Sequence, residues 1–264
     1  MFSVNYVNPN KELVFDQRQS GPGNTILTQA IDNRDIEITD VRNSDKKFTL
    51  DKQGFKPVYI DLEFDNFEDD EDLVSNLYPR VQAFVSRTLG VNHSLIFDHT
   101  YRSSTRKTKT VHNRAPVKTV HNDYTESSAK RLFDLQTQGR PELRGKSYQF
   151  VNLWLPVKYE VEESPLAFID LSTVDSADFR KLKLIYPDRV GEISGITYNS
   201  KHKWFYKSSM RPGEGMLFKV YDSELKDNIV GVPHSAVDFL VGEEKSVVNK
   251  RSSVEFRAIV FGEG

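Results

Sequence analysis

The sequence contains no cysteine. Disulfide bonds, thiolate metal sites, cysteine-held iron–sulfur clusters and cysteine nucleophiles are therefore excluded together, and any transition-metal site must use histidine and carboxylate ligands. Long apolar runs are also absent, since no stretch approaches the roughly 20 residues that a membrane-spanning helix needs. Residues 1–6 show no basic region followed by an apolar segment. We therefore expect a cytoplasmic protein without a membrane partner.

A strong charge of either sign is missing as well. The chain has 36 Lys and Arg against 38 Asp and Glu, a net charge of -2, which gives no reason to expect nucleic acid as a partner. Hydrophobic residues make up 38% and charged residues 28% of the 264 residues, the composition of a globular protein rather than a disordered one. A chain of this length can bury a sizeable core, and we expect one domain.

From Pro57 onward the pattern consists of short runs rich in β-branched and aromatic residues, separated by turn residues. We expect strands over residues 58–64, 94–101, 117–124, 148–157, 166–171, 193–198, 203–208, 216–222, 229–232 and 254–261. So many short strands predict a β-sandwich or a barrel.

Few helices interrupt this series. The acidic residues 68–72 precede apolar residues at helical spacing, Gly90 follows as the helix end, and Pro79 predicts a kink or a split helix. Residues 127–135 and 176–184 are further short helical candidates. The first 55 residues lack sustained periodicity, so we expect them to form an irregular arm packed on the core.

Only six histidines can supply imidazole ligands. At the end of one predicted strand, the period of two places His121 and Asp123 on the same face, so that both side chains converge on one point. His234, which follows Gly231-Val232-Pro233, is distant in sequence but could lie beside them in an antiparallel barrel. Two imidazoles and one carboxylate are the ligand set of non-haem Fe(II) oxygenases. We therefore predict a metal site on these three side chains.

The other histidines lack this context. His112 shares a preceding Thr-Val with His121, but Arg114 stands two residues later, and a permanent cation does not ligate a metal. His93 and His99 are not followed by an acid at that spacing, and we assign both to structure. His202 alternates with aromatic residues on a predicted strand, which favours the core, with a substrate contact as the alternative.

An arginine-rich segment leads into the last predicted strand. With a period of two, Arg251, Ser253, Glu255 and Arg257 share one face. Guanidinium groups that project into a barrel must meet anions, because burying an unpaired charge is costly. 2-Oxoglutarate has two carboxylates, which arginine binds through paired hydrogen bonds. We assign Arg251 with Ser253 to its far carboxylate, and Arg257 to its metal-bound carboxylate or to the substrate. The alternative is that Glu255 pairs with one arginine on an exposed edge strand.

Substrate contacts are predicted at three further positions. Asn152 and Trp154 alternate on a predicted strand and are candidates to line the pocket, with simple burial in the core as the alternative. Arg102 begins a basic segment that could receive an anionic substrate or form a solvated loop. This segment continues with Arg106, Lys107, Lys109, Arg114 and Lys118.

Several blocks, in this order along the chain, resemble the 2-oxoglutarate/Fe(II) oxygenases of the gibberellin desaturase and CmcJ-like (cephamycin methoxylation) family. The blocks are Phe97–Arg102, Val120–Thr125, Asn152–Pro156, Ser164–Ala167, His202–Tyr206 with Met210, Val220–Ser223, Pro233–Ala236 and Arg251–Arg257. The resemblance covers the chain from Val58 to its end. One departure stands in the Asn-x-Trp block, where family members usually carry arginine after the tryptophan and this chain has Leu155.

The resemblance implies a mainly β fold, with a double-stranded β-helix (jelly-roll) core and a few flanking helices. We expect a single oxygenase domain over residues 1–264, with residues 1–55 as the irregular arm and 56–264 as the jelly-roll core with helical insertions. The resemblance further implies Fe(II) on His121, Asp123 and His234, and 2-oxoglutarate on the arginine strand. Such an enzyme uses O2 to hydroxylate or desaturate a small-molecule metabolite of a secondary-metabolite pathway, and forms succinate and CO2.

Two other functions fit the same scaffold. A jelly-roll hydrolase could use Zn(II) on the same three ligands to activate water, although the paired arginines argue against it. A non-catalytic protein could bind a small molecule without a metal. No P-loop, Rossmann glycine pattern or His-Glu-x-x-His motif in the sequence supports another enzyme class.

Overall fold

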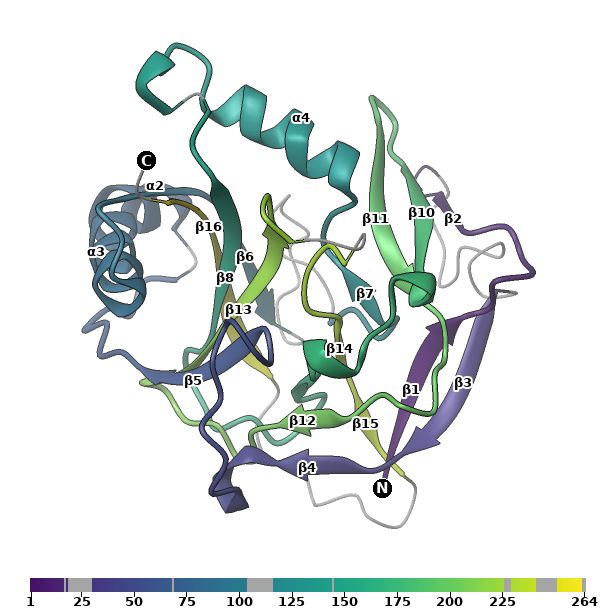
Figure 1. Ribbon diagram of the computed structural model, residues 1–264. Helices are drawn as coiled ribbons and strands as arrows, with labels where there is room; N and C mark the ends of the chain where they lie inside the picture. The colour runs from purple at the N-terminus through teal and green to yellow at the C-terminus, as the bar shows by residue number, and fades with distance from the viewer. Residues whose placement is uncertain are drawn as a thin grey trace.

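Short β-strands make up most of the ordered structure (Figure 1). The computed structural model describes residues 1–16, 18, 30–67, 69–103, 116–143, 145–225, 229–240 and 251–262. Several predicted positions lie outside these residues, namely Arg106, Lys107, Lys109, His112 and Arg114. Among the helices of the described ranges, none has the length and apolar character needed to cross a membrane.

Two facing sheets form the centre of the molecule. The larger sheet has the strand order β2 (Val14–Asp16), β10 (Phe179–Ile185), β11 (Val190–Ile196), β7 (His121–Asn122), β14 (His234–Ala236), β9 (Leu166–Ile169), β12 (Trp204–Tyr206) and β4 (Ile38–Asp40). The smaller sheet has the order β5 (Phe55–Tyr59), β13 (Glu214–Asp222), β8 (Tyr148–Pro156), β16 (Ser252–Phe261) and β6 (His93–Ser103).

Aromatic side chains fill the space between these sheets. Phe168 of the larger sheet stacks on Phe55 of the smaller one with ring centroids 4.9 Å apart, and meets Phe218 edge-on at 5.0 Å. All three are fully buried. Burial of such rings supplies much of the stabilisation of a sandwich core, and the predicted sandwich architecture is therefore confirmed.

The prediction of an irregular arm over residues 1–55 is wrong. β1 (Phe2–Val7) pairs with β3 (Ile31–Ile36) and with β15 (Asp238–Phe239) in a third sheet. β1 buries alternate residues against the larger sheet, whereas β3 has no buried residue and is mostly polar. A polar strand carries no hydrophobic period, because its structure depends on backbone pairing with a partner distant in sequence.

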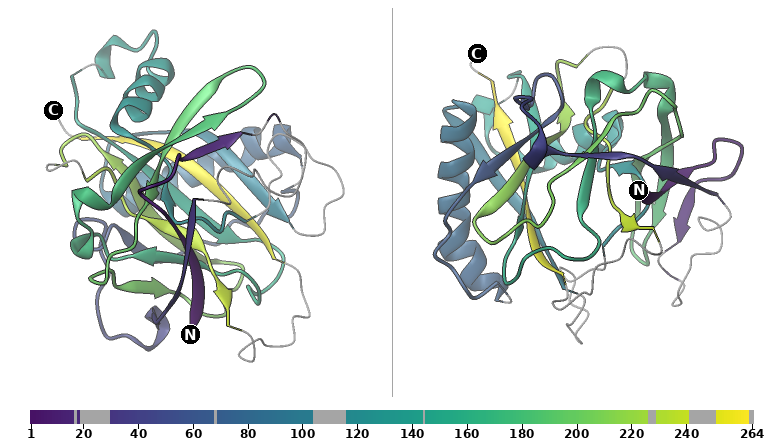
Figure 2. Two further views of the ribbon diagram at one scale, coloured as in Figure 1. Left: turned by 90° about the vertical axis from the view of Figure 1, so that its right-hand side faces the viewer. Right: turned by 90° about the horizontal axis from the view of Figure 1, so that it is seen from below.

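The predicted acidic helix is confirmed, with a break near Pro79. It comprises α2 (Asp70–Asp72), a π-helical turn (Leu73–Leu77) and α3 (Tyr78–Leu89). The Asp69 carboxylate caps the start by accepting from two backbone N–H groups, and Gly90, at φ 69, ends it. The wider turn before Pro79 accommodates the missing amide donor. α3 covers the outer face of the smaller sheet (Figure 2).

Among the other predicted helices, 127–135 is confirmed and 176–184 is wrong. The former is α4 (Glu126–Gln136), capped by Thr125. The latter begins as a 3-10 turn (Ser176–Asp178) and continues as β10, which pairs with β11 and β2. Leu182 and Leu184, two residues apart, suit a strand as well as a helix, and pairing with distant strands decides between them.

Some predicted strands are shorter or displaced. The run 117–124 contains only the two-residue β7, residues 229–232 precede β14 instead of forming a strand, and the run 58–64 is replaced by β5. Further 3-10 turns are Val41–Asn43, Pro141–Leu143 and Leu171–Thr173. The metal-ligand candidates therefore lie on short strands and their flanking loops, and not within long regular strands.

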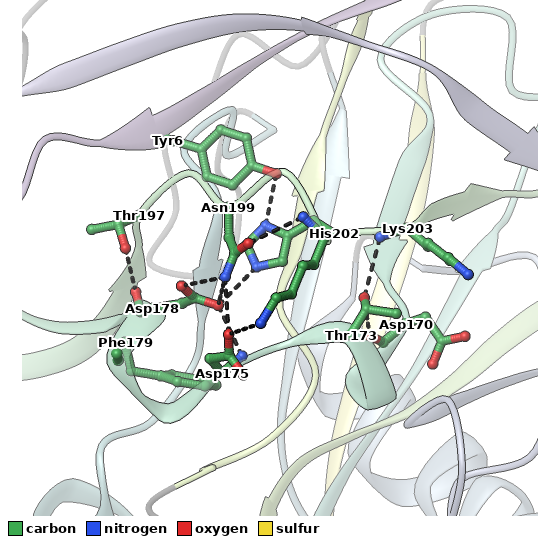
Figure 3. Close-up of polar contacts among 12 residues, drawn as sticks. Tyr6, Asp170, Thr173, Asp175, Asp178, Phe179, Thr197, Asn199, His202 and Lys203 are labelled. Atoms are coloured by element: carbon green, nitrogen blue, oxygen red, sulfur yellow. Dashed lines mark hydrogen bonds and ion pairs between the residues drawn. The ribbon is translucent and has the colours of Figure 1, made fainter.

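A buried polar network fastens β1 to the larger sheet (Figure 3). Trp204 Nε1 donates to the Tyr6 hydroxyl at 2.8 Å, which lies 3.0 Å from His202 Nδ1. His202 Nε2 lies 3.0 Å from Asp178 Oδ2. Because a carboxylate only accepts, Nε2 carries the proton, and Nδ1 accepts from Tyr6. His202 is therefore a structural residue, as its sequence context favoured.

Candidate metal and co-substrate site

The structure brings His121, Asp123 and His234 together. β7 and β14 are antiparallel neighbours in which His121 and His234 are register partners, and Asp123 follows β7 directly. Asp123 Oδ1 lies 3.5 Å from His121 Nε2 and 3.8 Å from His234 Nε2. All the potential ligand atoms lie within 4.8 Å of one another. One ion could therefore contact all three side chains.

The backbone sets the orientation of both imidazoles. His121 Nδ1 donates to the Thr119 carbonyl at 2.7 Å, and His234 Nδ1 donates to the Val232 carbonyl at 3.2 Å. Each Nδ1 must therefore carry a proton, which leaves the Nε2 lone pair directed at the cluster. Burial and the charge of His121 lower the pKa of His234 to about 3. A neutral imidazole is the form that binds a metal.

The Asp123 carboxylate is also oriented by the protein. Its Oδ2 accepts from Asn152 Nδ2 at 2.8 Å and lies 3.6 Å from Arg257 Nε. Burial alone would raise the pKa of Asp123, but His121 and the Arg257 guanidinium hold it well below its usual range. The group is therefore an anion in the folded protein, and with the two imidazoles it forms a donor set that fits Fe(II).

A tightly packed loop, residues 231–233, positions His234 at the site. Val232 N donates to the Lys219 carbonyl at 2.8 Å, and Ile169 N donates to the Pro233 carbonyl at 2.9 Å. At Gly231, a Cβ atom would lie only 2.3 Å from the Val220 carbonyl carbon. This close approach to β13 requires glycine.

Arg251 lies beside the triad in an environment that favours an anion. Its Nε donates to Ser253 Oγ at 3.3 Å, its Nη1 donates to the Ser164 carbonyl, and its guanidinium lies 5.0 Å from the Trp154 ring centroid. Burial, followed by the positive charge of Arg102, lowers the pKa of Arg251 to about 9. A carboxylate would offset both effects, so the arrangement fits one end of 2-oxoglutarate.

Arg257 has a different set of partners from Arg251. Its Nη1 donates to Asp98 Oδ2 at 2.9 Å and to Thr100 Oγ1 at 2.8 Å, and its Nη2 donates to Glu255 Oε1 at 2.6 Å. The alternative pairing of Glu255 with an arginine does occur, but not on an exposed edge, because β16 lies between β8 and β6. The sequence did not predict the roles of Asp98 and Thr100, although both lie in the Phe97–Arg102 block.

Asn152 and Trp154 are buried on β8 at the register partners of Arg257 and Glu255. Asn152 Oδ1 and Trp154 Nε1 find no hydrogen-bond partner among the residues that the structure describes. Leu155 is also buried, but it belongs to the cluster between the smaller sheet and α3. The departure from the family pattern at Leu155 therefore lies away from the metal ligands.

A pocket opens over the triad. Besides the triad, it is lined by Arg102, Val117, Leu166, Ala236, Arg251 and Glu255. The aliphatic side chains thus lie with His234 and the arginines around one small space close to the metal ligands.

Comparisons with known proteins agree with this chemistry. A family model described as oxidoreductase/YMDC permease-like domain matches residues 4–261. The hydroxylase/desaturase efuI of Hormonema carpetanum is 28% identical to this chain, with 86% of the chain and 83% of that protein covered. The alpha-ketoglutarate-dependent dioxygenase phiK of a fungal species (strain ATCC 74256) is 29% identical, with 87% and 84% covered.

Among solved structures, the iron and alpha-ketoglutarate-dependent endoperoxidase NvfI resembles this chain with a TM-score of 0.85 at 23% sequence identity. The match covers 100% of this chain and 98% of that one. At this level of identity the likeness shows the fold. The predicted mainly β, jelly-roll fold is thereby confirmed.

Proposed function

The chain belongs to the oxidoreductase/YMDC permease-like domain family, and we propose that it is a non-haem Fe(II)/2-oxoglutarate-dependent oxygenase. The observation that carries the proposal is the convergence of His121, Asp123 and His234 beside a buried Arg251. The names of the relatives efuI, a hydroxylase/desaturase, and phiK, an alpha-ketoglutarate-dependent dioxygenase, support it. Within these oxygenases, we propose that the chain is closest in kind to the gibberellin desaturase and CmcJ-like group, and that its product is a hydroxylated or desaturated metabolite.

Two separate sets of side chains are proposed to bind the metal and the co-substrate. His121, Asp123 and His234 would hold Fe(II), and Arg251 with Ser253 would hold the far carboxylate of 2-oxoglutarate. When bound, Fe(II) and 2-oxoglutarate would supply oxidising chemistry with O2, in which 2-oxoglutarate is converted to succinate and CO2. The protein contributes orientation, charge balance and exclusion of water from buried ligands. Because His121 and His234 are 8% and 3% exposed, solvent has little access to the inner side of the site.

The substrate is proposed to be a small molecule that places a C–H bond against the aliphatic wall of the pocket. Val117, Leu166 and Ala236 provide this wall. Arg102 lines the same pocket and is proposed to contact a polar group of the substrate. Asn152 and Trp154 are not among the lining residues, and Asn152 contacts Asp123 instead.

The proposal is tested by anaerobic titration of the purified chain with Fe(II) and 2-oxoglutarate. A weak visible charge-transfer band is expected when both are present, and admission of O2 should then release succinate. Arg251→Gln is expected to keep metal binding and to require much more 2-oxoglutarate for the band, because the buried cation is lost. A wild-type chain that binds Fe(II) but gives neither the band nor succinate would contradict the proposed function.

A further inference from the structure

We propose that Arg257 is a positioning residue that, with Asn152 and Glu255, presents a single oxygen of Asp123 to the metal. This inference rests on the proposed function and refines it. It also replaces the sequence-based assignment of Arg257 to 2-oxoglutarate or the substrate, and of Asn152 to the substrate.

The two oxygens of Asp123 have separate surroundings. Oδ1 faces the imidazoles, at 3.5 Å from His121 Nε2 and 3.8 Å from His234 Nε2. Oδ2 accepts from Asn152 Nδ2 at 2.8 Å and lies 3.6 Å from Arg257 Nε. A carboxylate with one oxygen bound by the protein cannot turn freely to offer both oxygens to an ion.

Asn152, Glu255, Arg257 and Asp123 form a closed ring of contacts. Asn152 Nδ2 also reaches Glu255 Oε1 at 3.4 Å, and that same oxygen accepts from Arg257 Nη2 at 2.6 Å. Asp98 and Thr100 on β6 hold the other terminal nitrogen of Arg257 at 2.9 and 2.8 Å. Side chains of β6 and β16 thus hold the guanidinium, and Asn152 of β8 contacts Glu255, so the orientation of Arg257 is set before any ligand binds.

Arg257, on β16, and Arg251, just before β16, differ in the charges that surround them. Arg257 faces the carboxylates of Asp123, Glu255 and Asp98, so this cluster carries an excess of negative charge that a divalent cation would balance. Although burial disfavours its charge, these carboxylates raise the pKa of Arg257. Arg251 has the cation Arg102 beside it as well as the carboxylates of Glu255 and Glu163. An incoming dianion therefore meets less like charge at Arg251 than around Arg257.

The test measures metal binding without 2-oxoglutarate, by calorimetric titration with Mn(II). Arg257→Gln is expected to weaken Mn(II) binding roughly 10–100-fold, the range for residues that orient a metal ligand. Arg251→Gln is the matched control, because it removes the same kind of side chain from the residue just before β16, six positions before Arg257. It should leave Mn(II) affinity unchanged and weaken 2-oxoglutarate binding to the Mn(II)-loaded protein.

Two further measurements separate positioning from simple structural support. The Co(II) absorption spectrum should change in Arg257→Gln, because a released Asp123 can offer both oxygens, and should be unchanged in Arg251→Gln. Arg257→Lys, which restores a positive charge but not the planar donor set, should recover part of the Mn(II) affinity. If Arg257→Gln does not fold, Asn152→Ala removes the other donor to Oδ2 and should weaken Mn(II) binding in the same direction.

Two results would contradict this role of Arg257. If Arg257→Gln binds Mn(II) like the wild type but loses affinity for 2-oxoglutarate, Arg257 is a co-substrate ligand and the inference is overturned. If none of the folded variants alters Mn(II) affinity, it is also overturned. A wild-type chain that binds Mn(II), with the variants behaving as expected, but that forms no succinate with Fe(II) would refute the proposed function alone.

Discussion

Two buried clusters of histidine and aspartate in this molecule differ in how the ring nitrogens are used. His202 has both nitrogens engaged, by Tyr6 and by Asp178, each at 3.0 Å. His121 and His234 have only Nδ1 engaged by the backbone, while each Nε2 faces Asp123 at 3.5 and 3.8 Å. The two 3.0 Å distances at His202 are hydrogen bonds, whereas 3.5 and 3.8 Å are too long for one.

This difference distinguishes a structural histidine from a metal-ligand candidate. His99 resembles His202, because its nitrogens lie 2.9 Å from the Tyr78 hydroxyl and 3.2 Å from Asp70. In both, the protein satisfies the whole ring, so that a ligand would have to displace an internal partner. In the triad, the Nε2 atom of each imidazole faces a common space, with Asp123 Oδ1 at 3.5 Å from His121 and 3.8 Å from His234. We therefore expect substitutions in the triad to reduce metal affinity with little loss of stability, and substitution of His202 to reduce stability with no loss of metal affinity.

The largest effect is expected from His121→Ala. Loss of a ligand should reduce Mn(II) or Fe(II) affinity by more than the roughly 100-fold that loss of a supporting residue costs, and succinate formation should fall with it. Calorimetry of metal binding checks this expectation, and urea unfolding of the metal-free chain should show little change. Wild-type metal affinity in this variant would show that the ligand set is wrong.

His202→Ala should lower the stability of the protein and leave its metal affinity unchanged. Removal of the imidazole leaves the buried Tyr6 hydroxyl without its hydrogen-bond acceptor and the Asp178 carboxylate with one donor fewer, which is expected to lower the free energy of unfolding by about 2–4 kcal/mol. Urea denaturation measures the loss. Metal affinity of the folded protein should remain that of the wild type, and a large drop in it would argue against two independent clusters.

Gly231→Ala should reduce both stability and metal affinity, each by less than the substitutions above. The added methyl group would meet the backbone of β13 at Val220, so we expect a loss of about 1–3 kcal/mol in unfolding free energy together with weaker metal binding as His234 shifts. Gly191→Ala is the control, because its Cβ would make only ordinary contacts, the nearest at 3.5 Å from Tyr186. Equal effects of the two substitutions would contradict a specific role for the loop before His234.

The smallest effect concerns pH. Burial lowers the pKa of His202 below its ordinary value of 6.5, although Asp178 and Asp175 oppose the shift. Below about pH 6.5 the unfolded chain therefore binds a proton that the folded chain does not, and stability falls as the pH decreases. The stability gap between the wild type and His202→Ala should narrow by at most about 1.4 kcal/mol per pH unit. Urea denaturation at pH 7.5 and 5.5 measures it, and a gap that widens at low pH would show that His202 is charged in the folded state.

Much of the fold was predictable where a pattern is local. The acidic helix start, Gly90 and the Thr125-capped helix all depend on residues within one or two turns of one another. β3 and β10 were not predictable in this way. β3 carries mostly polar side chains, and β10 has a spacing compatible with either helix or strand, so backbone pairing with β1, β2 and β11 gave them their structure.

For the site, the sequence by itself determined the candidate ligands. The period of two aligned His121 with Asp123, the absence of cysteine limited the ligands to histidine and carboxylate, and the Arg251–Arg257 strand indicated an anion site. Only the tertiary structure decided which arginine is held by carboxylates from other strands. Alternation along a strand fixes the face on which a side chain lies, but its partners come from other strands. Asp98 and Asn152, each more than ninety residues before Arg257, surround that arginine and connect it to Asp123.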